Sequence, residues 1–183
     1  MIERRKGGET GISAVQCLDG DAAWQWIREH AWGASLLDRA LSRCDTRRAG
    51  ALEQNVKSPS VFLLDYTSGL QTATYMLPGE IESFAFAASI HGEPEPVSTL
   101  MWLQPGRYYA HFSGLVYYIE ELILNGRPSY PVERTLLTTG ALAALFDSCY
   151  QNGQRVETPY LNISYTPARQ SFYNRGPAPK ATA

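Results

Sequence analysis

The central part of the chain, from Ser60 to Leu103, alternates apolar residues with polar or small ones at the spacing of β-strands. Short turns that contain glycine or proline divide it, and Ser68-Gly69 has the backbone freedom that a tight hairpin turn requires. The expected strands are Val61–Thr67, Leu70–Leu77, Ile81–His91 and Val97–Leu103. Strands joined in sequence by short turns predict an antiparallel meander.

Helical spacing appears on both sides of this central block. Before it, a short strand over Ile12–Leu18 leads into two helical segments that begin near Ala22 and Gly33. After it, two long helices are expected, the first ending near Asn125 and the second running from Pro131 to Gly153. Because helices and strands occur in separate blocks, the chain is predicted to be α+β. We expect a mostly antiparallel open sheet with the two long helices on one face, plus the short N-terminal β-α-α lead.

Both faces of the expected sheet carry apolar or small side chains. Along one predicted strand, Phe84 and Phe86 alternate with Ala85 and Ala87. An antiparallel sheet with a solvated face normally shows polar residues on that face. We therefore expect another domain, a second subunit or a ligand to cover the face that the helices leave open.

Length and composition indicate one folded domain over residues 1–165, followed by a disordered tail over 166–183. The chain has 183 residues, of which 44% are hydrophobic, and this is enough to form a core. The formal net charge is −2, which argues against a nucleic-acid partner. No apolar run approaches the roughly 18 residues needed to cross a bilayer, so no membrane partner is expected.

The cysteines are few and widely spaced. Cys17, Cys44 and Cys149 make an odd number and contain no Cys-x-x-Cys pair. This pattern predicts reduced thiols in a cytoplasmic protein, and neither a disulfide framework nor a zinc site.

The N-terminal segment is the densest cluster of charge and glycine. Arg4, Arg5 and Lys6, with Glu9 nearby, are candidate binding residues for a carboxylate, a sugar acid or a phosphate, since guanidinium groups bind such anions in pairs of hydrogen bonds. The competing interpretation is a solvated terminus, because blocks of charge are usually hydrated.

Three further residues are candidates for a substrate site. His111, near the start of a helix, is a possible acid or base, and Glu133 with Arg134 lies in the first turn of the next helix. For each of them a surface position is the competing interpretation. The sequence lacks nucleotide-binding glycine motifs and metal-type histidine spacing, so we expect no cofactor or metal site and assign no catalytic residue.

Several segments resemble the C-terminal half of Gfo/Idh/MocA-type oxidoreductases. The matching strings are Glu3–Gly11, Ala14–Leu18, Val97–Leu100, Tyr130–Gly140 and Arg155–Pro159, and Tyr130–Gly140 is the most specific. The resemblance implies an α+β domain whose open sheet lines the substrate pocket and often forms the oligomer interface. It also implies a parent protein with an N-terminal Rossmann domain that binds NAD or NADP. That half is missing here, so no cofactor is expected to bind this chain alone.

Three functions are compatible with these observations, and the sequence leaves open whether the chain is an enzyme. The first is the substrate-pocket and oligomerisation domain of an NAD(P)-dependent oxidoreductase acting on sugar- or cyclitol-like substrates, inactive alone. Its partner would be a second copy or a separate Rossmann domain. The alternative is a non-catalytic module that assembles or binds through the sheet. The third is a cofactor-free isomerase or hydrolase that uses His111 with a carboxylate.

Overall fold

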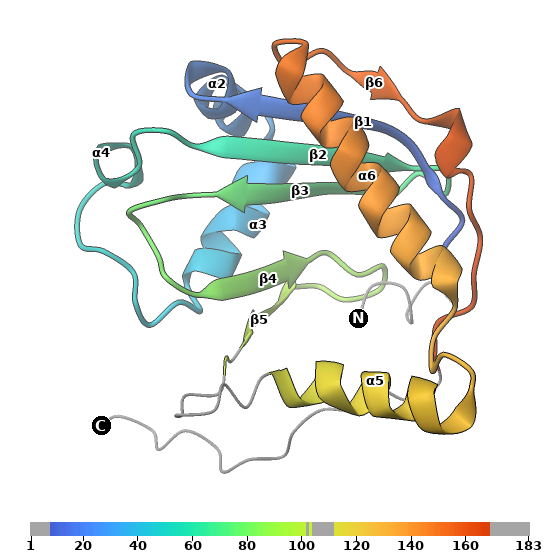
Figure 1. Ribbon diagram of the computed structural model, residues 1–183. Coiled ribbons are helices and arrows are strands. Elements are labelled where there is room, and N and C mark those ends of the chain that lie inside the picture. The colour runs from blue at the N-terminus through green and yellow to red at the C-terminus, as the bar shows by residue number, and fades with distance from the viewer. Residues whose placement is uncertain (1–7, 102, 104–111, 169–183) are drawn as a thin grey trace. The chain divides into compact units, whose positions relative to one another are not determined.

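The computed structural model describes residues 8–101, 103 and 112–168 (Figure 1). The chain divides into two compact units. The larger unit comprises Thr10–Trp102 and Leu137–Ile163, and the smaller unit comprises Met1–Glu9, Leu103–Leu136 and Ser164–Ala183. Residues 169–183 of the expected tail lie outside the described residues.

The structure consists of helices and antiparallel strands, as the sequence predicts. This confirms the α+β class with an open sheet. The strands are β1 (Ile12–Asp19), β2 (Ser60–Tyr66), β3 (Gln71–Met76), β4 (Phe84–Ala88), β5 (Val97–Met101) and β6 (Val156–Glu157). The helices are α2 (Asp21–Glu29), α3 (Ala31–Leu41), α4 (Leu52–Asn55), α5 (Ser113–Asn125), α6 (Val132–Tyr150) and the 3-10 turn η2 (Pro159–Leu161).

The main sheet has the strand order β3-β2-β1-β6, with every neighbouring pair antiparallel. The predicted β2–β3 hairpin is confirmed, and Gly69 in its turn has a φ of +82°, which favours glycine over other residues. The short strand predicted over Ile12–Leu18 is present as β1, which lies between β2 and β6. The N-terminal strand is therefore central to the sheet.

The expected four-stranded meander is wrong in its second half. β4 and β5 pair with each other but form a separate two-stranded sheet. The break lies after β3, where Leu77 and Glu80 turn inward and become buried. The backbone oxygen of Glu80 accepts a hydrogen bond from the Arg48 N–H, so this turn pairs with the preceding loop instead of continuing the meander.

The buried carboxylate of Glu80 holds this turn in place. It accepts hydrogen bonds from Arg47 Nε at 2.6 Å and from Asn55 Nδ2 at 2.7 Å. Burial acts to raise the pKa of Glu80, but the hydrogen bonds from Asn55 and Arg47 and the charges of Arg47 and Arg48 outweigh burial and lower the pKa. At neutral pH the site therefore holds an ionised and fully bonded carboxylate.

Helices lie on both faces of the main sheet (Figure 1). α2 and α3 pack on one face, where their apolar side chains join Val61 of β2 and Leu77 in one cluster. Directly paired residues of antiparallel strands share a face, so Cys17, Phe62 and Thr74 lie on the opposite face, toward α6. The buried core residues of α2 and α3 are Ala23, Ile27, Leu37 and Leu41.

An aromatic group closes one end of this cluster. Trp26 stacks on His30 with ring centroids 4.4 Å apart and meets the edge of Trp32 at 5.5 Å. A Cβ atom at Gly33 would come within 2.7 Å of the Trp26 ring and 2.8 Å of Tyr75 Oη, so only glycine fits inside α3 at this position. Trp26 and Tyr75 are partly buried and pack against the cluster, so this group lies at the margin of the core.

The smaller unit contains α5, whose apolar stripe is exposed. Leu115, Ile119 and Leu122 lie on one side of the helix and are each about half exposed. In the same unit, Tyr130 meets Tyr118 edge to face at 5.6 Å. No helix within the described ranges combines the length and the apolar content that a membrane span requires.

Replacement of Glu80 by glutamine tests the buried carboxylate. We expect Glu80→Gln to lower the free energy of unfolding at pH 7 by about 1–3 kcal/mol, because charge-assisted hydrogen bonds are lost at a buried site. Because the folded pKa of Glu80 is lowered from 4.5, its stabilisation is complete above that value and disappears as the pH falls through the folded pKa. Urea unfolding of both proteins at pH 7 and near pH 3 measures this difference.

The matched control is Glu82→Gln, since Glu82 is exposed two residues away. It should change the unfolding free energy by less than about 0.5 kcal/mol at either pH. Equal effects of the two substitutions at pH 7 would contradict a structural role for the Glu80 carboxylate.

Candidate functional site

The predicted binding residues do not assemble into one described site. Arg4, Arg5, Lys6 and His111 lie outside the described residues. Glu9 is buried at 7% exposure, and its backbone forms an isolated β-bridge with Tyr165.

The remaining two predicted residues lie in the first turn of α6, as the sequence indicates. Glu133 is exposed there, and the guanidinium carbon of Arg134 lies 5.6 Å from the ring centroid of Tyr130. This is the geometry of a cation–π contact. Arg134 is thus engaged by an aromatic ring within its own unit.

An arginine that the sequence analysis did not single out forms an ion-pair network across the sheet. Arg155 contacts the carboxylate of Asp65 on β2 and that of Glu157 on β6, the latter at 3.1 Å. Burial acts to raise the pKa of Asp65, but hydrogen bonds from Arg155 and Gln71 and the charge of Arg155 outweigh it and lower the pKa. Two carboxylates already engage this guanidinium, so the cluster joins strands and is not an open anion site.

A disulfide bond joins β1 to α6, and the prediction of reduced cysteines is wrong for this pair. Cys17 and Cys149 are 132 residues apart in the sequence, yet their Cα atoms are 5.3 Å apart and their sulfur atoms are bonded. Cys44 is the free cysteine among the described residues. Nothing local to either cysteine signals the pairing, because only the packing of α6 on the sheet brings them together.

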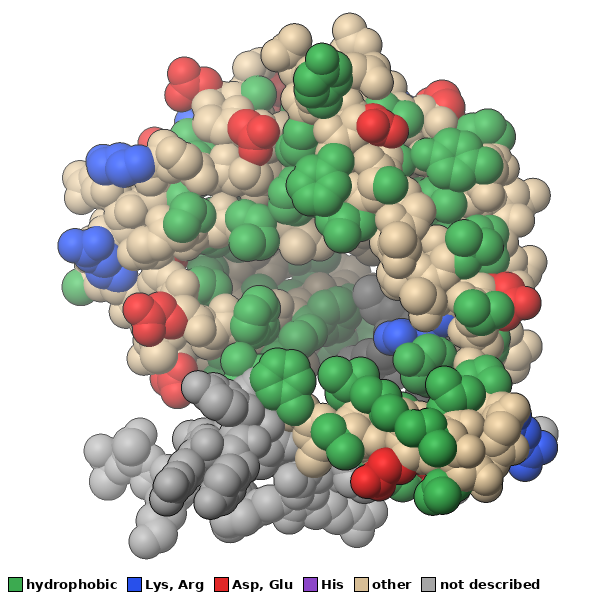
Figure 2. Space-filling view, viewed as in Figure 1, with side chains coloured by type: hydrophobic (Ala, Val, Ile, Leu, Met, Phe, Trp, Pro, Cys, Tyr) green, Lys and Arg blue, Asp and Glu red, His purple; other side chains and the backbone are tan. Residues whose placement is uncertain are grey.

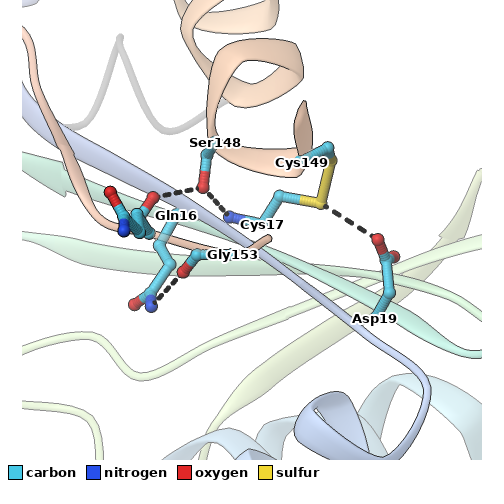
Figure 3. The surroundings of a disulfide bond; sticks show 7 residues. Gln16, Cys17, Asp19, Ser148, Cys149 and Gly153 are labelled. Atoms are coloured by element: carbon cyan, nitrogen blue, oxygen red, sulfur yellow. Dashed lines mark hydrogen bonds between the residues drawn. A yellow bond between two sulfur atoms is a disulfide. The ribbon is translucent and has the colours of Figure 1, made fainter. Parts of the chain in front are cut away.

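Hydrogen bonds hold the same two elements together independently of the disulfide (Figure 3). The Cys17 N–H donates to Ser148 Oγ at 2.9 Å, and Ser148 Oγ donates to the Gln154 carbonyl at 2.5 Å. Gln16 Nε2 donates to the Gly153 carbonyl at 2.8 Å. We call this set of contacts the β1–α6 junction.

The turn after α6 fits closely against β1. Gly153 has a φ of +82°, and a Cβ atom there would lie 3.0 Å from the Cys17 carbonyl oxygen. A side chain at this position would therefore strain the backbone and press on the strand. The predicted end of the helix at Gly153 agrees with this turn.

A carboxylate accompanies the sulfur pair. Asp19 Oδ2 lies 3.7 Å from Cys17 Sγ, and the ligand-type atoms of Cys17, Asp19 and Cys149 all lie within 4.8 Å of one another (Figure 3). Cys17 is buried, Cys149 is partly buried and Asp19 is exposed, so the set opens to solvent at the carboxylate. Its chemistry is that of a dithiol–disulfide pair beside a negative charge.

A second candidate surface is the outer face of α6. Leu137, Ala144 and Ser148 are buried on the side of this helix that packs on the larger unit. The opposite side carries Leu142 and Phe146, and Figure 2 shows hydrophobic side chains gathered over α6 on the side that faces the viewer. This side of α6 therefore presents large apolar side chains to solvent.

Comparisons with known proteins found no relative. No protein-family model matches the chain, and no curated protein or solved structure matches it. The function is therefore argued from the geometry alone.

Removal of the Ser148 hydroxyl tests the β1–α6 junction. We expect Ser148→Ala to lower the free energy of unfolding by about 1–3 kcal/mol, because the buried Cys17 N–H loses its acceptor. Denaturant unfolding under oxidising conditions measures the change with the disulfide intact.

Ser42→Ala is the control, since the Ser42 hydroxyl is exposed and bonds locally to the Arg39 carbonyl. A change below about 0.5 kcal/mol is expected there. If Ser148→Ala were as mild as the control, Ser148 would not secure the junction.

Proposed function

We propose that this protein is a non-catalytic assembly module that forms homodimers through the outer face of α6. The observation that supports the proposal is an exposed apolar stripe on α6, most of which lies in a stretch without charged residues, with Asp147 beside its C-terminal end. Its members are Leu142, Phe146 and Tyr150, which are 53%, 64% and 91% exposed. They follow each other at intervals of four residues and so lie on one side of the helix.

The absence of charge along this stretch distinguishes the stripe from an ordinary solvated helix face. From Thr135 to Phe146, α6 contains no acidic or basic residue. The exposed positions there include Thr139 and Ala143 in addition to the large apolar side chains. A surface helix normally presents charged residues to water, and contiguous apolar patches of this kind usually mark binding surfaces.

A second copy of the chain is the occupant that best fits this stripe. An uncharged stripe has no ion-pairing groups that would select an oppositely charged partner. In a two-fold dimer each stripe packs against the same stripe of the other copy, which closes the assembly at two subunits. Met76, 52% exposed, lies on the same side of the main sheet as α6 by its pairing with Ser60 and adds a further exposed apolar side chain to that side.

The oxidoreductase function stays a prediction. It rests on the resemblance to the Gfo/Idh/MocA C-terminal half, and most of the residues expected to bind its substrate lie outside the described part of the chain. A cytoplasmic location also stays a prediction, and the reduced cysteines that suggested it are now limited to Cys44 among the described residues.

A charge placed in the stripe tests the dimer. We expect Phe146→Glu to raise the dimer dissociation constant by about 10²-fold or more, because each dimer loses two buried phenylalanine side chains and gains two charges at the interface. Analytical ultracentrifugation over a concentration series, with circular dichroism to verify folding, measures the effect.

The control is Ser35→Glu, which adds the same charge at an exposed position of α3, on the opposite face of the main sheet. Its dissociation constant should match that of the wild type. A wild-type protein that remains monomeric at about 100 μM, where weak specific complexes already form, would overturn the proposal.

Titration with dinucleotides distinguishes the assembly module from the oxidoreductase. We expect no heat of binding when NAD or NADP is added to this chain, since the sequence contains no glycine fingerprint for a pyrophosphate. Isothermal titration calorimetry makes the measurement. Binding with a dissociation constant below about 1 μM would contradict the assembly-only function and favour the oxidoreductase.

A further inference from the structure

The β1–α6 junction brings together three groups that are ligands for zinc. The Sγ atoms of Cys17 and Cys149 and a carboxylate oxygen of Asp19 lie within 4.8 Å of one another. Thiolate and carboxylate are both common Zn²⁺ ligands, and three protein ligands leave a fourth position for water. In the disulfide form the two sulfur atoms are bonded to each other and are not available to a metal.

Asp19 lies two residues after Cys17 on β1, so the alternation of the strand places its carboxylate on the same face as the sulfur pair. Its carboxylate lies 3.7 Å from Cys17 Sγ, and the described residues offer its side chain no other polar partner. A sulfur atom in a disulfide carries no hydrogen, so this contact is not a hydrogen bond while the disulfide is intact. A carboxylate beside two sulfur atoms is favourable when a cation lies among them.

The end of α6 also favours a cation at this place. Cys149 lies in the last turn of α6, where the helix dipole is negative. That turn contains no basic residue and carries Asp147, so no side chain within it offsets the dipole. A divalent cation bound there would balance the charge of the two thiolates and would lie favourably at the negative end of the helix.

The hydrogen bonds of the junction keep the two cysteines close without the covalent bond. Ser148 Oγ accepts a hydrogen bond from the Cys17 N–H, and Gln16 donates one to the Gly153 carbonyl, both close to the sulfur pair. These contacts involve backbone groups of β1 and of the turn after α6. We therefore expect the ligand-bearing elements to stay in place after reduction.

We propose that the reduced protein binds one Zn²⁺ ion through the thiolates of Cys17 and Cys149 and the carboxylate of Asp19, and that the disulfide and the zinc complex are alternative states of this site. A dithiol reductant supplies two electrons and two protons, which break the Sγ–Sγ bond and give two thiols, while the dithiol becomes a disulfide. Zinc binding then releases the two thiol protons. The proposal does not depend on self-association.

The test is metal titration of the chain before and after reduction. Protein reduced with a phosphine, then freed of it, is titrated with Zn²⁺ against a chromophoric chelator and separately with Co²⁺ as a spectroscopic probe. We expect one Zn²⁺ per reduced chain with a dissociation constant below about 1 μM, and a thiolate-to-cobalt charge-transfer band. The oxidised protein should bind neither metal at this site.

Single substitutions assign the ligands. Cys149→Ser should abolish the charge-transfer band of a two-thiolate site, whereas Cys44→Ser, which removes the free cysteine, should leave zinc affinity unchanged. Asp19→Asn leaves both cysteines, and so the disulfide, intact. It should weaken zinc binding at least about tenfold, because even the loss of a group that only hydrogen-bonds to a metal ligand typically lowers metal affinity by about that factor.

Two results would overturn the proposal. One is a reduced protein that binds no zinc, whether or not circular dichroism shows it folded. The other is zinc binding that is equal in the wild type and in Asp19→Asn, since cysteines of an unfolded chain would bind without the carboxylate. Either result would leave the Cys17–Cys149 pair as a structural cross-link only.

Discussion

Strand β1 is the element on which the larger unit depends, because both of its edges are bonded. Along one edge it pairs with β2 over almost its whole length. The other edge is covered in pieces by β6, by Thr158 and by Ser148 of α6. Thr158 is fully buried and bonds β1 twice, through its N–H to Ser13 and its hydroxyl to Ile12. The C-terminal part of the larger unit thus supplies the hydrogen-bond partners for the second edge of β1.

The two sides of this sheet are stabilised in different ways. On the α2–α3 side, apolar packing dominates, with Leu41 and Val61 almost fully buried. On the α6 side, polar contacts and the Cys17–Cys149 disulfide fix the end of the helix. The two cysteines are 132 residues apart, and in the chain-entropy model a disulfide that closes a loop of this length adds about 4–5 kcal/mol to the free energy of unfolding. Because the junction fixes the rotation of α6 about its axis, it also decides that Phe146 faces outward.

Local patterns predicted the elements well where neighbouring residues determine them. The β2–β3 hairpin followed from alternation and from Ser68-Gly69, and the structure has that hairpin. The continuation into β4 was wrong because Glu80 finds its partners, Arg47 and Asn55, in the loop that precedes β2. An acidic residue after a Pro-Gly turn looks solvated in sequence, and only its distant partners show that it is buried.

The sequence by itself determined the period of each segment, the turns between segments and therefore the α+β class, since these depend on residues a few positions apart. The tertiary structure alone decided the partner of Cys17 and which side of α6 faces outward. The physical reason is the same for both. Contacts across more than a hundred residues arise from the packing of a helix on a sheet, and such packing leaves no mark on the local spacing of either partner.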